Sequence, residues 1–405
     1  MPKLPKTDLA GRFTYLPIED TFFGAGAVRH LSEALDGVGS KRAVVITGKT
    51  LSQTNAAMDP LQAALGDRCA GVFSATTQHV PRQAVLAAAD FAREKNADAI
   101  VSFGGGSPND TAKAVLLALA EGIETPEAFE RYRIKFEYPD KIEIPPMTQP
   151  ALPLFAVPTT LSAGEFTHFI GITDEQRKVK DLYIDKRLMA KAVILDPELT
   201  RHTPDWLWLS SGIRSVDHAI EAICSTTAQP FTDALGYRAL DMLFRYLPEC
   251  RADPEDLAAR VQCQVAAWLS ISGLASVTLG LSHGIGHQLG ARCNVPHGET
   301  SCVMLHNVMR FNHEQTRTRQ AWIAEAVGAR QPDMDDEAAA AAAPEAVLTL
   351  VRDKLALPWR LRDVGVEEND FAGIATDAMQ DLIVATNPRP VASRDEVVEL
   401  LRQAW

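Results

Sequence analysis

The sequence has little of what marks several large classes of protein. Cysteine is scarce, with 6 among 405 residues, and no two cysteines are spaced as Cys-x-x-Cys, which indicates reduced thiols. Lysine and arginine together number 40 against 52 acidic residues, which gives a net charge of -12. This balance argues against nucleic acid or an anionic membrane as a partner.

Long apolar runs and a secretion signal are also missing. The most apolar long stretch, 265–281, is interrupted by Ser270, Ser272, Ser276 and Thr278, so we expect a buried helix there and no membrane span. The first residues, MPKLPK, do not contain the apolar core that a signal peptide needs. These absences predict a cytoplasmic protein.

The first half of the chain alternates short apolar runs with helical patterns. The β-branched and apolar runs predict buried parallel strands. With 46% hydrophobic and 23% charged residues, a chain of this length is expected to form two domains. We predict that residues 1–198 form an α/β domain with a doubly wound parallel sheet. The predicted strands are 42–47, 99–103, 154–157 and 192–195, and the predicted helices are 61–65 and 84–95.

Strand signals stop near residue 197, where long Ala- and Leu-rich helical patterns begin. We therefore predict an all-helical domain over residues 199–405. A charged, aromatic and proline-rich segment, 124–149, departs from the rhythm of the first half, and we interpret it as a surface insertion at the mouth of a cleft. The predicted helices of the second half are 233–244, 254–281, 316–327, 346–354 and 396–403.

A glycine-rich loop stands between a predicted strand and a predicted helix. Gly104, Gly105 and Gly106 follow the strand, while Ser107 and Asp110 lie at the start of the helix. Glycine lets the backbone approach a ligand closely, and the free N–H groups and dipole of a helix N-terminus favour a pyrophosphate. The alternative is a tight turn without a ligand, but three consecutive glycines are conformationally costly, which favours a binding site.

Three of the 10 histidines fall within a single stretch of the second half. His283 and His287 are four residues apart and share one face of a helix, and His297 follows a proline in a loop-like segment that can turn back towards that face. A fourth, His218, lies in a helical pattern far upstream. Imidazoles gathered in this way bind a metal ion, relay a proton, or do both.

Taken in order, these motifs resemble the iron-containing (group III) alcohol dehydrogenase superfamily. The resemblance rests on the glycine loop, a Pro-Thr-Thr segment at 158–160, a His-x-x-Glu segment at 218–221 and the three downstream histidines. It implies a dinucleotide-binding domain, a helical domain, a cleft between them, and hydride transfer between NAD(P) and an alcohol or carbonyl. The spacing over 158–167 is similar to that of the maleylacetate reductase branch. The family also implies a homodimer that acts on a small molecule.

The resemblance further implies how the cofactor is held. Thr159 and Thr160 would line the nicotinamide end, and Lys180 would meet the nicotinamide ribose. Members specific for NAD carry an Asp at the end of the second strand, which bonds the ribose hydroxyl and repels a 2′-phosphate. The matching position here is Gly48, followed by Lys49. We therefore predict that NADPH is accepted, alone or together with NADH.

One position departs from the family pattern. Metal-dependent members hold the ion with an Asp and three His, and the Asp lies four residues before the first His. Here that position is Arg214, while His218, His283 and His297 occupy the histidine positions. Arginine offers no lone pair and stays protonated. Asp217 lies about 100° round the helix from His218, which makes it a poor substitute.

Two interpretations follow, and we favour the first. In the first, no metal binds, and Arg214 supplies the positive charge that holds a substrate carboxylate or polarises a carbonyl. In the second, Arg214 swings away and the three histidines bind zinc or iron with one position open. His287 is the expected proton donor. Glu221 lies three residues from His218, where it either orients that ring or lies on the helix surface.

The expected activity is the reduction of a carboxylated oxo compound such as maleylacetate by NADPH or NADH. Arg214 and His218 would hold the polar end of the substrate. The main alternative is a metal-dependent alcohol dehydrogenase that acts on a small or aromatic alcohol. A lyase of the related dehydroquinate-synthase architecture would need further Lys and Glu ligands, and a protein that only binds the cofactor would have no use for His287. We assign no role to His168, His306 or His313.

Overall fold

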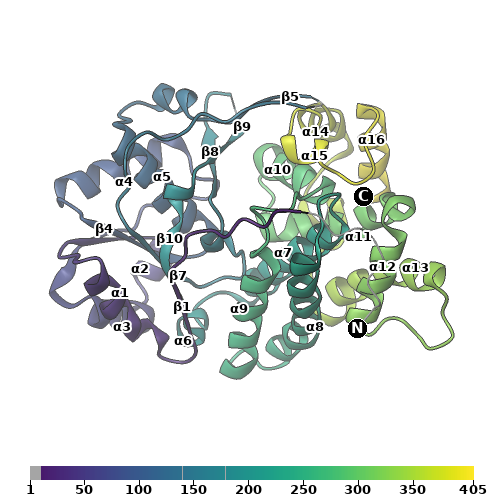
Figure 1. The fold of residues 1–405 in the computed structure, drawn as a ribbon, viewed down its shortest axis with the longest axis horizontal. Coiled ribbons are helices and arrows are strands. Elements are labelled where there is room, and N and C mark those ends of the chain that lie inside the picture. Colours follow the sequence, from purple (N-terminus) through teal and green to yellow (C-terminus); the bar gives the residue numbers. More distant parts are fainter. Residues whose placement is uncertain (1–10, 139, 178) are drawn as a thin grey trace.

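The computed structural model describes residues 11–138, 140–177 and 179–405. The parallel sheet lies in the first half of the chain and the long helices lie in the second half, so the ribbon divides into two parts (Figure 1). The expected fold class, an α/β domain followed by a helical domain, is confirmed.

The α/β domain is built on a twisted parallel sheet. In the described part of the chain this sheet has 6 strands in the order β1-β10-β7-β4-β2-β3. Each neighbouring pair runs parallel, as the continuous apolar runs predicted. The strands are β1 (Asp20–Phe23), β2 (Ala43–Thr47), β3 (Cys69–Phe73), β4 (Ala99–Gly104), β7 (Leu154–Pro158) and β10 (Ala190–Leu195).

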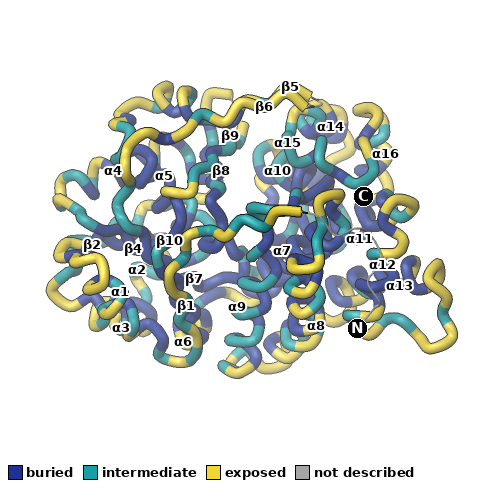
Figure 2. Tube along the Cα trace, viewed as in Figure 1, coloured by how far each residue is buried: buried dark blue, intermediate teal, exposed yellow. Residues whose placement is uncertain are grey.

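Helices cover both faces of this sheet because alternate strand residues are apolar on both sides. In β2, Val44 and Ile46 pack into one core, while Val45 packs into the core on the opposite face. Fully burying such a side chain contributes about 1.5–3 kcal/mol. The helices of the first core are α4 (Arg82–Glu94) and α5 (Gly106–Glu121), and those of the second are α1 (His30–Gly37) and α3 (Asn55–Leu65). The same contrast between buried strands and exposed outer helix faces is visible in Figure 2.

Three strands that carry predicted cofactor residues end side by side. The register pairs Thr47 of β2 with Phe103 of β4, and Gly104 of β4 with Pro158 of β7. Gly48, the glycine loop and the Pro-Thr-Thr segment therefore leave the same edge of the sheet. In open parallel sheets this carboxyl edge is where ligands bind.

An antiparallel hairpin that the sequence did not predict completes this side of the domain. It consists of β8 (Phe169–Asp174) and β9 (Val179–Ile184), and it places Lys180 opposite Thr173. In β9 the buried residues are Asp181 and Tyr183, while Leu182 and Ile184 are only partly buried, so its sequence lacks the alternation of apolar and polar residues by which a strand is recognised.

The helical domain begins after β10; it shares the first core with the α/β domain and has a further core of its own. The predicted helices exist, but one boundary was wrong: the helix expected over 254–281 ends at Ile271, and turns precede the next helix. Gly273 sits in these turns, where a Cβ would lie 2.4 Å from Cγ2 of Thr232. The principal helices are α7 (Asp205–Cys224), α8 (Pro230–Ala252), α9 (Leu257–Ile271), α10 (Leu281–Cys293), α11 (His297–Phe311), α12 (His313–Ala326), α13 (Asp336–Thr349), α14 (Phe371–Ala378), α15 (Leu382–Ala385) and α16 (Arg394–Gln403).

The segment 124–149 reaches from one domain to the other. It contains a 3₁₀ turn (Pro126–Arg131) and the hairpin of β5 (Lys135–Glu137) and β6 (Lys141–Glu143). The hairpin arches over towards α14, α15 and α16 (Figure 1), and Oη of Tyr138 donates to the carbonyl of Val391 at 2.9 Å. Within the described residues, no helix is both long and apolar enough to cross a bilayer.

Candidate active site

A cavity of about 490 Å³ is lined by residues of both domains. The α/β domain contributes the glycine loop and the β8–β9 hairpin, and the helical domain contributes the histidines. Most of the sequence-predicted site residues meet here. Those that line the cavity are Gly105, Gly106, Ser107, Asp110, Thr160, Lys180, Arg214, His218, His283, His287 and His297.

The glycine loop opens α5 towards this cavity. A Cβ on Gly105 would lie 3.0 Å from Cγ2 of Thr160, and Gly104 has a φ of +136°, which L side chains rarely adopt. The first N–H groups of any α-helix have no carbonyl of a preceding turn to bond, so the N-terminal end of α5 can bind a pyrophosphate. The loop therefore fits the expected dinucleotide.

Three predicted cofactor residues do not line the cavity. Gly48 ends β2 and precedes α2 (Lys49–Ser52), Gly104 ends β4, and the buried Thr159 accepts a hydrogen bond from Oγ1 of Thr203 at its carbonyl. Thr160 lines the cavity and Thr159 does not, and the role of Thr159 at the nicotinamide end stays a prediction. Gly48 remains at the carboxyl edge, where a ribose would lie beyond this cavity.

Lys180 projects across its own hairpin into the cavity. A Cβ on Gly171 would lie 2.1 Å from Cε of Lys180, so only glycine leaves room for this side chain. Burial lowers the pKa of Lys180; Asp110 opposes this shift and Arg214 adds to it. The hairpin that sequence reasoning missed thus delivers a cation to the polar end of the cavity.

The four histidines gather from three helices, as expected from their spacing. His218 of α7 stacks on His283 of α10, with ring centroids 4.9 Å apart. His287 of α10 lies parallel to His297, with centroids 5.9 Å apart and 3° between the planes. His297 is the first residue of α11 and not part of a loop, because Pro296 caps that helix.

Arg214 lies in the middle of this group. Its Nη2 donates to Nε2 of His297 at 2.7 Å, and its Nη1 donates to Oγ of Ser301 at 3.0 Å. The residue is 3% exposed, and its Nη1 lies 3.7 Å from a carboxylate oxygen of Asp217, which supplies the counter-charge. Arg214 is therefore held inward by three neighbours in this structure.

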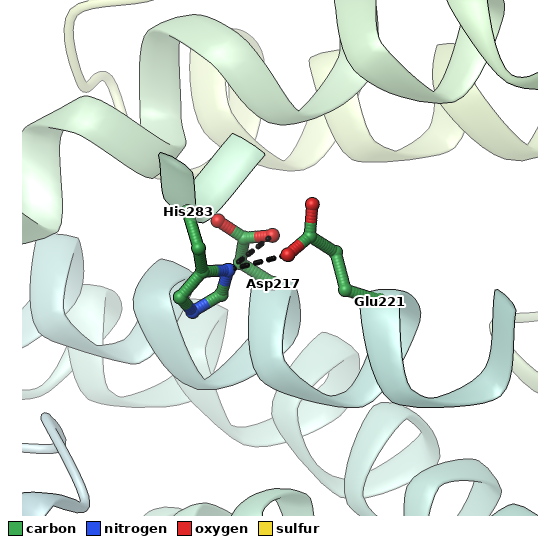
Figure 3. A group of neighbouring side chains, drawn as sticks. All are labelled: Asp217, Glu221 and His283. Carbon is green, nitrogen blue, oxygen red and sulfur yellow. Dashed lines mark hydrogen bonds and ion pairs between the residues drawn. The ribbon is translucent and has the colours of Figure 1, made fainter. Parts of the chain in front are cut away.

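Asp217 and Glu221 both contact Nδ1 of His283 (Figure 3), a pairing that the sequence did not suggest. Glu221 accepts from Nδ1 of His283 at 2.7 Å, so the expectation that it orients His218 was wrong. The side chain of Glu221 lies beside the start of α10 and not beside His218 of its own helix. There it also accepts the backbone N–H groups of Gly280 and Ser282. Ser282 and Ser301 both donate to Asp217.

Burial and charge divide the imidazoles into two kinds. Burial and the nearby Arg214 hold the pKa values of His218 and His297 well below the usual range, so both rings are neutral. Burial also disfavours a charged His283, but Asp217 and Glu221 outweigh it and raise the pKa of that ring. The polar end of the cavity thus presents the guanidinium of Arg214 beside the neutral rings of His218 and His297, with Lys180 entering from the β8–β9 hairpin.

His287 has a partner that the sequence did not reveal. Its Nδ1 lies 2.8 Å from Oδ2 of Asp381, a residue 94 positions away that begins the short helix α15. No local signal marks Asp381, because its carboxylate also serves as an ordinary N-cap.

The parallel sheet, the glycine loop at its carboxyl edge and the polar cavity beyond it define a nicotinamide-dependent dehydrogenase. The chain belongs to the iron-containing alcohol dehydrogenase family. The family model for iron-containing alcohol dehydrogenase matches residues 19–197, and the model for the C-terminal part of the Fe-containing alcohol dehydrogenase family matches residues 209–405.

Individual relatives differ in their named activities. The lactaldehyde reductase of Escherichia coli K12 is 31% identical over 393 residues, covering 96% of this chain and 98% of the relative. The maleylacetate reductase of Pseudomonas sp. strain P51 is also 31% identical, over 95% of this chain and 94% of the relative. The NAD-dependent methanol dehydrogenase of Bacillus methanolicus is 32% identical, over 94% and 97%. The structure of a 1,3-propanediol oxidoreductase superposes with a TM-score of 0.88 at 29% identity, covering 97% of this chain and all of that one.

The chain is therefore an oxidoreductase that uses a nicotinamide cofactor on alcohol or carbonyl groups. The family name implies iron, but one of the four residues at the expected ligand positions, Arg214, does not fit a divalent cation. The guanidinium of Arg214 stands where an Asp ligand is expected, and it already uses the lone pair of Nε2 of His297. Asp217, Glu221 and His283 also lie close together; Glu221 bonds Nδ1 of His283 and two serines bond Oδ2 of Asp217, whereas Oδ1 of Asp217 and Nε2 of His283 have no hydrogen-bond partner among the described residues.

Proposed function

We propose that this enzyme reduces a carbonyl compound that carries a carboxylate, of the maleylacetate type, with NADPH or NADH and without a metal ion. The contact between Arg214 and His297 carries the proposal. It supplies a fixed positive charge in a buried cavity, and such charges recognise carboxylates and developing oxyanions strongly.

Arg214 is suited to bind the substrate because its guanidinium has more N–H donors than it has hydrogen-bond partners within the protein. A guanidinium has five N–H donors, and the hydrogen bonds described above account for Nη1 and Nη2 only in part. The neutral ring of His218 faces the same cavity and adds a second polar contact. Together they hold the oxygen atoms of the substrate and stabilise negative charge that develops on the carbonyl oxygen.

The nicotinamide, when bound, supplies the hydride that reaches the carbonyl carbon. The electron pair of the C=O bond then moves to the oxygen, which takes a proton to give the alcohol. His287 lines the cavity and is the residue we assign to donate this proton. Thr160, Lys180 and the glycine loop hold the cofactor from the side of the α/β domain.

A cofactor with a 2′-phosphate is compatible with the edge of the sheet. Gly48 carries no charge at the position where an acidic side chain would repel the phosphate, and Lys49 follows it on the surface. We therefore include NADPH in the proposal.

The deciding experiment measures metal content by mass spectrometry on enzyme purified without chelators, with NADPH oxidation by maleylacetate assayed on the same sample. We expect less than one-tenth of an equivalent of metal per chain, as an order of magnitude, and turnover that chelators do not change. Stoichiometric iron or zinc with activity that chelators abolish and the metal restores would overturn the metal-free proposal.

The second candidate function is that of a metal-dependent alcohol dehydrogenase. The observation in its favour is that both halves of the chain match models named for iron. It predicts fast alcohol oxidation by the metal-loaded enzyme and weak reduction of oxo acids, so a comparison of the two substrates on one preparation separates the candidates.

A further inference from the structure

The stacked pair His287 and His297 joins two separate hydrogen-bond systems. His297 is bonded to the cationic Arg214 on one side, whereas His287 is bonded to the anionic Asp381 on the other. The two systems come from different elements, since Arg214 lies on α7 and Asp381 lies at the start of α15. They therefore place opposite charges behind two parallel imidazoles.

Asp381 is itself held in a fixed position. Its Oδ1 accepts the backbone N–H of Ile383 at 2.8 Å, and its Oδ2 accepts Nε2 of Gln288 at 3.1 Å. The side chains of Asp381 and His287 are 8% and 15% exposed. Oδ2 thus has one lone-pair direction left for His287, and solvent competes little for it.

This contact determines which nitrogen of His287 carries hydrogen. An ionised carboxylate only accepts hydrogen bonds, so Nδ1 of His287 must donate. Its Nε2 is then the nitrogen left for the cavity that the ring lines. A carboxylate behind a histidine in this way fixes the ring orientation and the tautomer, and stabilises the protonated form without taking the proton itself.

We propose that Asp381 is the positioning residue of the proton donor, acting through His287, while Arg214 and His218 bind the substrate. This inference rests on the proposed function for the identity of the donor. When the carbonyl oxygen takes the proton from Nε2, His287 becomes neutral and keeps its remaining hydrogen on Nδ1 against Asp381. Solvent then returns a proton to Nε2 before the next turnover, so protons and electrons balance over the cycle.

The test is Asp381→Asn, because the amide keeps the size of the side chain and can still cap α15. With its oxygen accepting from Ile383, the amide nitrogen faces His287 and donates, which forces hydrogen onto Nε2 of a neutral ring. We expect kcat for NADPH-dependent reduction of maleylacetate to fall about 10- to 100-fold, with KM nearly unchanged, as for other partners that orient a functional histidine. Thermal unfolding should be unaltered.

Two further variants separate positioning from a structural role. In His287→Ala, adding Asp381→Asn should cause no further loss, because a residue that acts through His287 has nothing left to orient. Asp377→Asn is the matched control: Asp377 pairs with Arg292 at the far end of α10, and its removal should leave kcat unchanged. An equal loss from Asp381→Asn with and without His287 would overturn the proposal.

A spectroscopic measurement keeps the inference independent of the substrate. Nitrogen-15 NMR of the histidine side chains, recorded at a pH where the ring of His287 is neutral, should show its remaining hydrogen on Nδ1 in the wild type and on Nε2 in Asp381→Asn. If maleylacetate is not reduced but this tautomer switch is observed, the proposed function fails while the positioning role stands. If the tautomer is the same in both proteins, the positioning role fails whatever the substrate.

Discussion

Nη2 of Arg214 donates to Nε2 of His297 across 2.7 Å, so a protonated side chain occupies the bond that a metal ion would otherwise make. The arrangement is stable because Asp217 lies 3.7 Å from the same guanidinium and Ser301 bridges the two. Under the metal-free proposal, Arg214 supplies the positive charge that the family name assigns to iron.

Arg214→Asp should turn this site towards metal binding. The variant has one carboxylate and His218, His283 and His297 in the family arrangement, and Asp217 loses its counter-charge unless a cation enters. We expect it to take up about one zinc or iron per chain, and its kcat/KM for the oxo acid to fall about 100-fold, close to 3 kcal/mol. Metal analysis and steady-state kinetics measure both. Arg214→Met is the control, because it should lose activity without gaining metal.

Gly48→Asp should change the choice of cofactor. A Cβ there would meet only Oγ1 of Thr76, at 3.7 Å, so the substitution fits the backbone and places a carboxylate at the end of β2. Repulsion of the 2′-phosphate should raise KM for NADPH about 10-fold or more and leave KM for NADH unchanged or lower. Gly48→Asn supplies the same bulk without charge. Equal effects of the two variants on NADPH would show that shape, and not charge, governs the site.

Gly298→Ala should destabilise the junction of α7 and α11. A Cβ on Gly298 would lie 2.7 Å from the backbone carbon of Ser210, and backbone cannot move aside as a side chain can. We expect a loss of about 2–3 kcal/mol in the free energy of unfolding, despite the better helix propensity of alanine. Gly373→Ala is the matched control, since its Cβ would meet only the flexible guanidinium of Arg292. Denaturant unfolding curves that coincide for both variants would contradict this.

His168→Gln should reduce the acid sensitivity of the fold. Burial, with Lys113 and Lys186 nearby, lowers the pKa of His168 to about 4, whereas an unfolded histidine titrates near 6.5. The unfolded state therefore binds more protons between these values, so the folded state is favoured fully above about pH 6.5 and loses stability as the pH falls towards 4. Between pH 7 and 5 the variant should lose about 2 kcal/mol less than the wild type. Urea unfolding curves at pH 7 and pH 5 measure this difference in the free energy of unfolding. The control is His313→Gln, which removes a ring paired with Glu337.

The apolar strands and the order of the motifs were predictable because each depends only on a short run of consecutive residues. β2 and β4 are continuous buried runs, and the three glycines follow β4 directly. The histidine spacing also predicted the shared face of α10. These features need only the period of a strand or a helix to be recognised.

The parts of the site that could not be predicted depend on the packing of distant elements. Glu221 binds His283 because α7 crosses α10, and Asp381 binds His287 because α15 returns to α10. The overextended helix prediction at 271–281 failed for a related reason. Apolar residues there line the cavity and satisfy the helical pattern without belonging to a helix.

The contact between the hairpin at 135–143 and the helical domain can form only late in the synthesis of the chain. The sheet is complete once β10 has paired with β1, so the α/β domain has all of its strands when residue 195 has been synthesised. Domains that leave the ribosome first generally fold first. The hydrogen bond from Tyr138 to Val391, however, has to wait until almost the entire chain has been made. This hydrogen bond therefore forms only when both domains have been synthesised and lie against each other, long after the segment that carries Tyr138 was translated.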